Sequence, residues 1–180
     1  MKQNDINSNL QTYAASFAAF TASNPLPKNW FGAPDHFAIK CASKDSYDET
    51  CDDVEKFSDG GIWQIELNNS YLASAKLSQK IELDNIGSVD WIEIMQPRPG
   101  MEPDSDFVEH VEFYYPNFDE ITEILAKNDI VFELQDNSSH SWVNVVIDKT
   151  GREIKFSNKT LAKIVEEEKR VGRLEKRTVR

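Results

Sequence analysis

Two short stretches of the chain, "DHFAIKC" (residues 35–41) and "EHVEFYY" (residues 109–115), share one pattern. Each begins with an acidic residue and a histidine and continues as a short apolar alternation, in a chain that has only three histidines. Side chains alternate between the two faces of a strand. Each stretch therefore predicts a strand with one apolar face, which packs on a helix, and a histidine on the opposite face, which looks into a concavity.

The segments that follow the first stretch predict one helix and three strands. In "SKDSYDETCDDVEKF", Tyr47, Cys51 and Val54 are spaced along one helical face. Ser46 with Glu49 is placed as a capping box, and the two glycines of "DGG" are expected to end the helix. Strand-like alternation then recurs in "GIWQIELNN", in "YLASAKLS" with "KIELDN", and in "SVDWIEIMQ".

The same order follows the second stretch after the turn-rich linker "PRPGMEPDSD". "NFDEITEILAKN" predicts a helix with Asn117 and Glu120 as a capping box and Asn128 as its stop. "DIVFELQ", "SWVNVVID" and "REIKF" predict three more strands. The middle of the chain thus repeats the order β-α-β-β-β, and an internal repeat at this scale indicates two equivalent modules.

A helix is predicted at each end of this repeat. "LQTYAASFAAF" places apolar residues on one helical face, and "KTLAKIVEEEKRVGRLEKR" predicts a closing helix buried through Leu161, Ile164 and Val165. The predicted fold is α+β, built from two equivalent β-α-β-β-β modules with an added helix at each end. The predicted units are residues 1–34 (helix and linker), 35–100 (first module), 101–158 (second module) and 159–180 (helix and basic tail).

Composition and charge exclude several classes of protein. The net charge is −11, and residues 1–168 carry 14 basic and 30 acidic residues, so the body would repel nucleic-acid phosphates. The basic tail, residues 169–180, is interpreted as a solvated helix end, with contact to RNA or to an acidic partner as the alternative. The chain has no apolar run long enough to span a membrane and begins with a polar segment, so we expect a cytoplasmic protein. Cys41 and Cys51 are expected to be buried thiols.

The duplicated order and the paired histidines resemble the vicinal oxygen chelate superfamily, which includes glyoxalase I, extradiol dioxygenases and bleomycin-resistance proteins. More narrowly, "DHFAIKC", "EHVEFYYP" and "REIKFSNKTLAKIVEEE" are similar to the corresponding stretches of the bacterial YecM family, over roughly residues 8–168. The resemblance implies that the two modules pair into an incomplete barrel around a divalent metal in a cavity between them. For the YecM family it implies a metal-binding protein whose reaction is not defined.

The resemblance also implies roles for particular residues. The superfamily places a ligand on the first strand of each module, where this chain has His36 and His110, and a carboxylate on the last strand of each module. Glu93 is the nearest carboxylate in the first module. In the second module the ligand position is occupied by Lys155. Because a protonated ammonium has no free lone pair, Lys155 is expected to contact an anion or a cofactor and not to be a metal ligand. Glu112, on the same strand face as His110, is the candidate replacement oxygen.

Two imidazoles with one or two carboxylates suit Fe(II), Mn(II), Zn(II) or Ni(II). The alternatives are that the histidines are hydrogen-bonded core residues and that Glu112 forms an ion pair with Lys40 or Lys155. His140 is interpreted as a loop residue, and the tryptophans on predicted strands, Trp63, Trp91 and Trp142, as core residues first and cavity wall second.

At the level of function, the sequence predicts a divalent-metal-binding protein that acts on a small oxygenated molecule as an isomerase, lyase or oxygenase. A non-catalytic protein that binds a small ligand in the same cavity is the alternative, and a protein that interacts through its basic tail is a third. The sequence does not decide whether the protein is an enzyme, nor does it give the oligomeric state.

Overall fold

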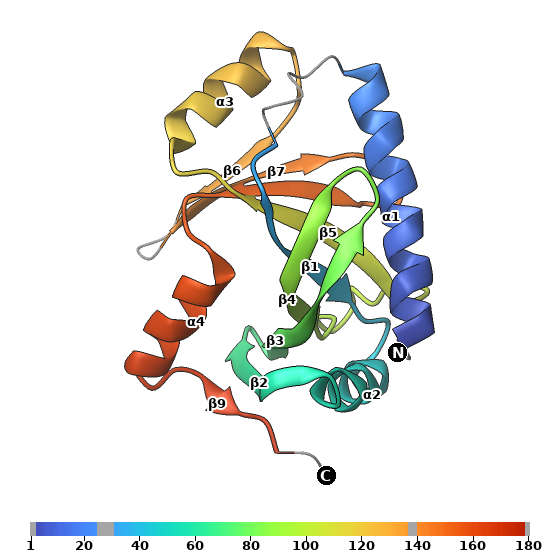
Figure 1. Ribbon diagram of the computed structural model, residues 1–180, viewed down its shortest axis with the longest axis vertical. Coiled ribbons are helices and arrows are strands. Elements are labelled where there is room, and N and C mark those ends of the chain that lie inside the picture. The colour runs from blue at the N-terminus through green and yellow to red at the C-terminus, as the bar shows by residue number, and fades with distance from the viewer. Residues whose placement is uncertain (1–2, 25–30, 137–139, 179–180) are drawn as a thin grey trace.

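The computed structural model describes residues 3–24, 31–136 and 140–178, in which four helices surround one open sheet of nine strands (Figure 1). The elements of the first half are α1 (Gln3–Ser23), β1 (Pro34–Lys40), α2 (Lys44–Glu55), β2 (Ser58–Leu67), β3 (Ser70–Leu83) and β4 (Gly87–Met95). Those of the second half are β5 (Phe107–Tyr114), α3 (Phe118–Lys127), β6 (Glu133–Asp136), β7 (Ser141–Val146), β8 (Glu153–Ser157), α4 (Leu161–Arg170) and β9 (Glu175–Lys176). The α+β class predicted from the sequence is confirmed.

The sheet consists of two copies of one strand arrangement. Its order is β6-β7-β8-β5-β1-β4-β3-β2-β9, so that β1 lies beside β4 in the first module and β5 lies beside β8 in the second. Both of these pairs are parallel, and the other pairs within each module are antiparallel. The modules join where β1 and β5 pair antiparallel. This arrangement is the predicted incomplete barrel, because the two outer ends of the sheet do not pair with each other.

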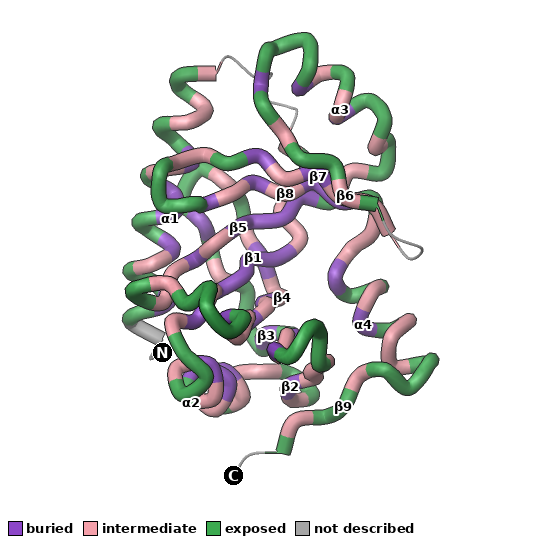
Figure 2. Tube along the Cα trace, turned by 180° about the vertical axis from the view of Figure 1, so that it is seen from behind, coloured by how far each residue is buried: buried purple, intermediate pink, exposed green. Residues whose placement is uncertain are grey.

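The apolar faces of β1 and β5 form the centre of the core, as their alternation predicts. Phe37, Ile39, Val111 and Phe113 are fully buried, and the strands that carry them are the most continuously buried part of the trace (Figure 2). Cys41 lies in the same core, and burial raises the pKa of its thiol to about 12, so it is an unreactive apolar group at neutral pH.

Helix α1 covers the core from one side, and α4 lies on the opposite side of the molecule (Figure 1). Within α1, Tyr13 is fully buried; its hydroxyl donates to the carbonyl of Glu153 at 2.6 Å and accepts from the backbone N–H of Val111 at 3.1 Å. One side chain thus ties α1 to β5 and β8. Because His110 precedes Val111 in β5, this contact also fixes the strand that carries the second histidine.

Two local predictions for α2 are wrong. The helix begins at Lys44 because Ser43, not Ser46, is its N-cap: the Ser43 hydroxyl accepts from the Ser46 backbone N–H at 3.1 Å. The helix ends at Glu55, and the two glycines expected to end it, Gly60 and Gly61, lie within β2 at positive φ. The capping-box pattern does not identify Ser43, because the residue three positions later is another serine. Ser46 with Glu49 matches that pattern instead.

The predicted capping box of α3 does not form. Asn117 is the N-cap, but its side chain makes no hydrogen bond to the helix backbone and instead donates to the Glu120 carboxylate at 2.7 Å. Asn128 ends the helix as predicted. The strand predicted over "DIVFELQ" is shorter than expected, because only residues from Glu133 onward pair with β7.

The basic tail is not a solvated helix end. Helix α4 ends at Arg170, Gly172 takes a positive φ of 71°, and β9 then pairs with β2. Arg177 forms ion pairs with Asp48 (3.4 Å) and Asp52, which lie on or near the exposed side of α2. The tail is therefore docked onto the first module, and its residues 179–180 lie outside the described part of the chain.

The three tryptophans on strands are not core residues. Trp63, Trp91 and Trp142 are all only partly buried, and Lys169 of α4 lies 3.7 Å above the ring centre of Trp63.

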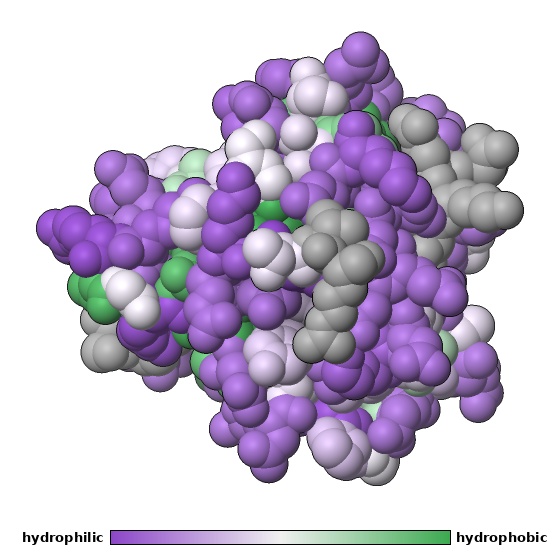
Figure 3. All heavy atoms as spheres, turned by 90° about the horizontal axis from the view of Figure 1, so that it is seen from below, coloured by the Kyte–Doolittle hydropathy of each residue, from purple (hydrophilic) through white to green (hydrophobic). Residues whose placement is uncertain are grey.

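The surface seen from below is mostly hydrophilic, with hydrophobic side chains in small separate areas (Figure 3). No helix among the described residues combines the length and apolarity that crossing a bilayer needs.

Candidate metal centre

The seam between the modules contains two β-bulges, and each bulged residue is an acid that precedes a histidine. Along β1, Pro34 pairs with Phe113 and His36 with Glu112, so Asp35 is the extra residue. Along β5, the partners of Ala38 and Ile39 are His110 and Val108, so Glu109 is the extra residue. A bulge rotates the strand locally and redirects a side chain. The two acids can therefore reach the face on which the histidines lie.

Each acid accepts a hydrogen bond from the imidazole that follows it. Asp35 Oδ2 lies 2.9 Å from His36 Nδ1, and Glu109 Oε2 lies 3.2 Å from His110 Nδ1. Both acids are also held from a second side: Asp35 accepts from the Leu161 backbone N–H at the start of α4 (2.7 Å), and Glu109 forms an ion pair with Lys40 (2.8 Å). A carboxylate on Nδ1 fixes the orientation of the ring and leaves Nε2 as the free nitrogen.

The two free nitrogens converge. The rings of His36 and His110 are 5.8 Å apart between centroids, and each residue is only 1% exposed. Neither Nε2 atom has a hydrogen-bond partner among the described residues. Together with a carboxylate oxygen of Glu112 they form a group of three ligand atoms that all lie within 4.8 Å of one another. Buried polar atoms are normally paired, so two unpaired imidazole nitrogens aimed at one carboxylate need an explanation.

Glu93 of β4 completes the cluster. Its Oε2 lies 3.6 Å from His36 Nε2 and 4.0 Å from His110 Nε2, so the carboxylate predicted from the first module does reach the histidine pair. Burial alone would raise the pKa of Glu93, but the close approach and charge of His36, followed by the charges of His110 and Lys155, lower it to about 2. Glu93 is thus an anion at neutral pH.

The two histidines differ in their electrostatic surroundings. Burial disfavours the charged form of His36, but Glu112, Asp35 and Glu93 outweigh burial and raise its pKa to about 10. For His110, burial and the charge of Lys155 lower the pKa to about 4 against the opposing effect of Glu109. The cluster therefore holds one positive charge, on His36, where its carboxylates converge. A metal ion bound there would supply the positive charge in place of the proton on His36.

Glu112 is not neutralised by a lysine. Burial raises its pKa to about 7, with the charge of Glu93 adding to burial and His36 opposing it. The expected alternative, an ion pair with Lys40 or Lys155, does not form: Lys40 pairs with Glu109, and Lys155 has no carboxylate oxygen within 4 Å among the described residues. Lys155 is nevertheless the strand neighbour of Glu112, because the two are Cα partners across β5 and β8.

The cluster opens into a cavity with two lobes. The first lobe, of about 530 Å³, is lined by His36, Glu93 and Glu112 and is walled by Trp142 and by Leu161 and Ile164 of α4. The second lobe, of about 480 Å³, is lined by Glu109, Glu153 and Asn144, among others. Volumes of this size suit small molecules. His140, interpreted above as a loop residue, stacks on Trp142 with 4.8 Å between ring centroids and also lines the first lobe, while residues 137–139 beside it lie outside the described chain.

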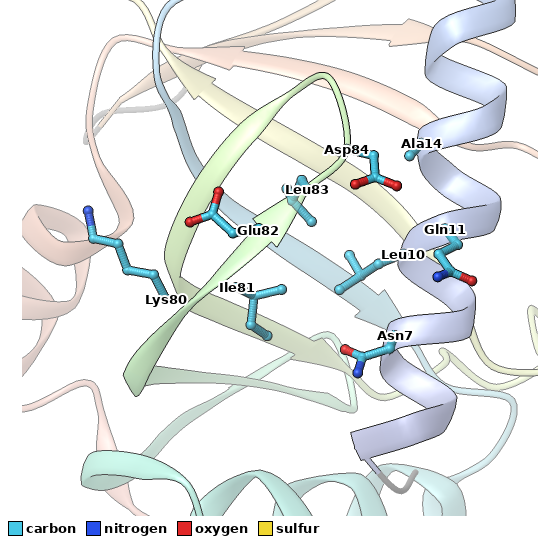
Figure 4. Close-up of a pocket in the computed structure, with 9 residues that line it drawn as sticks. All are labelled: Asn7, Leu10, Gln11, Ala14, Lys80, Ile81, Glu82, Leu83 and Asp84. Carbon is cyan, nitrogen blue, oxygen red and sulfur yellow. The ribbon is translucent and has the colours of Figure 1, made fainter.

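A further hollow lies away from this site, between α1 and the β3 strand (Figure 4). Its volume is about 360 Å³, and its walls are formed by Asn7, Leu10, Gln11 and Ala14 of α1 and by residues 80–84. It contains neither histidine nor any other residue of the cluster. Of these three cavities, only the two lobes at the module seam contain chemistry-bearing residues predicted from the sequence.

Sequence reasoning missed Asp35 and Glu109. Simple strand alternation places each acid on the face opposite its histidine, and the bulges that bring acid and histidine together depend on cross-strand register. The signal was nevertheless present, because both histidines follow an acid directly. The lining residues of α4, such as Ile164, were predicted only as buried core positions.

Comparison with known proteins supports the fold. No protein-family model and no curated protein sequence matches the chain. Among solved structures, the structural-genomics protein EC4020 is 17% identical, with a TM-score of 0.72 over 92% of each chain. The hypothetical protein BH1468 from Bacillus halodurans C-125 is 13% identical, with a TM-score of 0.50 over 71% of this chain and 94% of that one.

A weaker likeness joins the chain to an enzyme. A Streptomyces coelicolor methylmalonyl-CoA epimerase, solved with 2-nitronate-propionyl-CoA, is 16% identical, with a TM-score of 0.47 over 71% of this chain and 96% of that one. A likeness of this degree carries no argument about function, and the chemistry is argued from the site itself.

Proposed function

We propose that the protein binds one divalent metal ion through His36 Nε2, His110 Nε2 and the Glu112 carboxylate, with Glu93 as a further oxygen donor. The observation that carries the proposal is the pair of buried imidazole nitrogens that have no hydrogen-bond partner and face the same carboxylate. Two imidazoles with one or two carboxylates form a donor set for Fe(II), Mn(II), Zn(II) or Ni(II). The same donor set on a vicinal oxygen chelate type of fold supports the resemblance drawn from the sequence.

The protein's own residues prepare the site for a ligand. Asp35 and Glu109 hold the two rings by their Nδ1 atoms, so that the Nε2 atoms stay directed at the carboxylates. Leu161 and Ile164 of α4 form an apolar wall of the adjacent lobe and limit the access of water. A divalent ion in this position would polarise an oxygen atom of a bound small molecule. Isomerase, lyase and oxygenase chemistry on a small oxygenated molecule all use that effect.

Non-catalytic binding of a small ligand would use the same cavity. It is the less favoured function, because a plain binding pocket does not require two inward imidazoles, each oriented by its own carboxylate. The two functions are separated by incubating metal-loaded protein with oxygenated acids and ketones and following them by proton NMR. Proton exchange or conversion of such a compound that requires both the metal and Glu93 identifies an enzyme.

The metal proposal is tested by calorimetry on protein purified without a histidine tag. We expect saturable binding of about one Mn(II), Ni(II), Zn(II) or Fe(II) ion at neutral pH, with affinity that falls as protons compete for the imidazoles at lower pH. The double variant His36→Ala, His110→Ala should not bind, and the single variant His36→Gln, which keeps a polar side chain, should bind weakly. His140→Ala is the matched control and should bind normally. Absence of saturable binding of all four ions to wild-type protein would refute the proposal.

A further inference from the structure

The two lobes of the cavity meet at five residues. Leu67, Leu72, Met95, Arg98 and Lys155 line both lobes. Three of these residues are apolar and two are cations. The junction therefore presents two positive groups beside a short apolar wall. The first lobe also contains Glu93 and Glu112 of the metal centre, so the junction lies next to the position of the proposed ion.

The two cations are not neutralised by ion pairs. Among the described residues, neither Arg98 nor Lys155 has a carboxylate oxygen within 4 Å. The other cations of the two lobes are paired: Arg173 with Glu168 at 3.1 Å and Lys40 with Glu109 at 2.8 Å. Arg98 and Lys155 are thus the cations that remain available to a ligand in the described cavity.

The charge of the first lobe leads to the same conclusion. Apart from the histidines, which must be neutral to bind a metal, its lining contains three carboxylates and three cations, which are Glu93, Glu112, Glu168, Arg98, Lys155 and Arg173. A divalent ion bound at the histidine pair would leave the lobe with an excess of positive charge. In a partly desolvated cavity such an excess is unfavourable unless an anion enters with the metal.

We propose that Arg98 and Lys155 form an anion subsite beside the metal centre, and that the ligand is a small carboxylic acid with a neutral oxygen and a short apolar body. The carboxylate contacts the guanidinium and the ammonium, the neutral oxygen faces the metal, and the apolar body packs against Leu67, Leu72 and Met95. This inference rests on the proposed metal function, and it adds the class of substrate. It also gives Lys155 a role that the metal centre alone does not require.

The test uses two probes that differ mainly in charge. 2-Oxobutyrate and 1-hydroxy-2-butanone have the same four-carbon skeleton and the same ketone, but only the first carries a carboxylate. We expect Mn(II)-loaded wild-type protein to bind 2-oxobutyrate at least tenfold more tightly than the neutral ketone, because hydrogen bonds to charged groups contribute more than neutral ones. Calorimetry at constant salt measures both affinities.

Two variants then locate the preference. Lys155→Met and Arg98→Gln should each lower the affinity for 2-oxobutyrate about tenfold and leave the affinity for the neutral ketone unchanged. Mn(II) binding should be retained in both, or tightened in Lys155→Met, since a positive charge near the metal is removed. Lys127→Met, at the exposed end of α3, is the matched control. Arg98 is exposed after the end of β4, so Arg98→Gln keeps the test open even if Lys155→Met does not fold.

The outcomes separate this inference from the metal proposal. If Mn(II) binds but the preference for 2-oxobutyrate is absent, or survives in both variants, the anion subsite is wrong and the metal centre stands. If none of Mn(II), Ni(II), Zn(II) and Fe(II) binds, the metal proposal is wrong, and the same titrations on metal-free protein decide the subsite. There, a preference for the anion that both variants lose supports the subsite, and no preference overturns it.

Discussion

His36 and His110 could be found from the sequence because each occupies the same place in a repeated strand pattern. Glu93 followed from the resemblance, as the carboxylate nearest the implied ligand position on the last strand of its module, and the structure places it within 4.0 Å of both Nε2 atoms. Asp35 and Glu109 could not be found by the same rule, since alternation assigns neighbours in a strand to opposite faces. Only the register between β1 and β5 shows that both acids are bulged residues.

Removal of the charge on Asp35 should weaken metal binding without removing a ligand. Asp35→Asn keeps an oxygen for the Leu161 backbone N–H but no longer offers a carboxylate to His36 Nδ1. Loss of such a partner typically lowers metal affinity about 10–100-fold, and calorimetry with Mn(II) measures it. Asp45→Asn, at an exposed position in the first turn of α2, is the control. Equal affinities in the two variants would mean that Asp35 does not orient the ring.

Lys155→Glu restores the carboxylate that the resemblance places at the end of the second module. It adds an anionic oxygen on the strand position paired with Glu112, so we expect the affinity for divalent ions to rise. Calorimetry with Mn(II) on folded variant protein is the measurement, with Lys127→Glu as the control. Unchanged affinity in a folded Lys155→Glu protein would mean that the cavity is not a metal site of this kind.

At the scale of elements, periodicity predicted the helices and the order of the strands, whereas the ends of the elements depended on particular contacts. Helix α2 ended earlier than its glycines suggested, and those glycines instead allow β2 to bend at positive φ. The tail after Gly172 turned back to pair with β2, which no local pattern within residues 169–180 indicates. Pairing partners distant in the chain decided both cases.

The turn between β3 and β4 depends on a glycine that supports the start of β1. Gly87 has φ +131°, and a Cβ atom there would lie 2.9 Å from the ring of Pro34. We expect Gly87→Ala to destabilise the protein by about 2–4 kcal/mol, from backbone strain and the contact with a rigid ring. Denaturant unfolding measures the change. Gly100→Ala, with positive φ but open space around it, isolates the strain alone and should be milder. Equal destabilisation by the two substitutions would show that the contact with Pro34 does not contribute to the effect of Gly87→Ala.

The turn between β7 and β8 should make stability depend on pH. Asp148 accepts from Ser16 (2.6 Å), from the Thr150 backbone (2.8 Å) and from Arg152 (3.0 Å). Burial opposes ionisation, but these hydrogen bonds outweigh burial and hold the pKa of Asp148 below its ordinary value. A lowered pKa in the folded state stabilises the fold above pH about 4, and that stabilisation is lost as the pH falls further.

Asp148→Asn tests that dependence. At pH 7 the variant should be less stable by about 1–3 kcal/mol, and the difference should shrink as the pH is lowered toward 3, where the carboxyl of the unfolded chain takes up its proton. Chemical unfolding at the two pH values provides the comparison, with Asp104→Asn in the exposed linker as the control. A difference that is the same at both pH values would show that the charge of Asp148 does not matter.

At the scale of the whole molecule, the repeat determined where the candidate site lies, because the two equivalent strands meet at the module seam. The shape of the cavity could not be predicted in the same way. Its walls include Arg98 from the linker, Trp142 from β7 and Ile164 from α4, which come together only when both modules and the last helix are packed. Sequence patterns describe single elements well and cavities between distant elements poorly.

Because His36 belongs to the first module and His110 to the second, a metal ion at the seam would link the two halves and stabilise the whole fold. An ion present at a hundred times its dissociation constant adds about 2.7 kcal/mol if it binds only the folded state. For a chain of this length that corresponds to an increase in Tm of about 5–10 °C. Calorimetric or fluorescence melting with and without Mn(II) measures it.

Variants show which site causes this increase in Tm. The double variant His36→Ala, His110→Ala should show no increase in Tm with Mn(II), and His140→Ala should show the full increase. Because His140 lines the same cavity but does not belong to the converging group, the pair of variants distinguishes the seam from general binding of cations to an acidic surface. An increase that persists in the double variant would place the ion elsewhere on the molecule, and the link between the two modules would then have to come from the strand pairing of β1 and β5 alone.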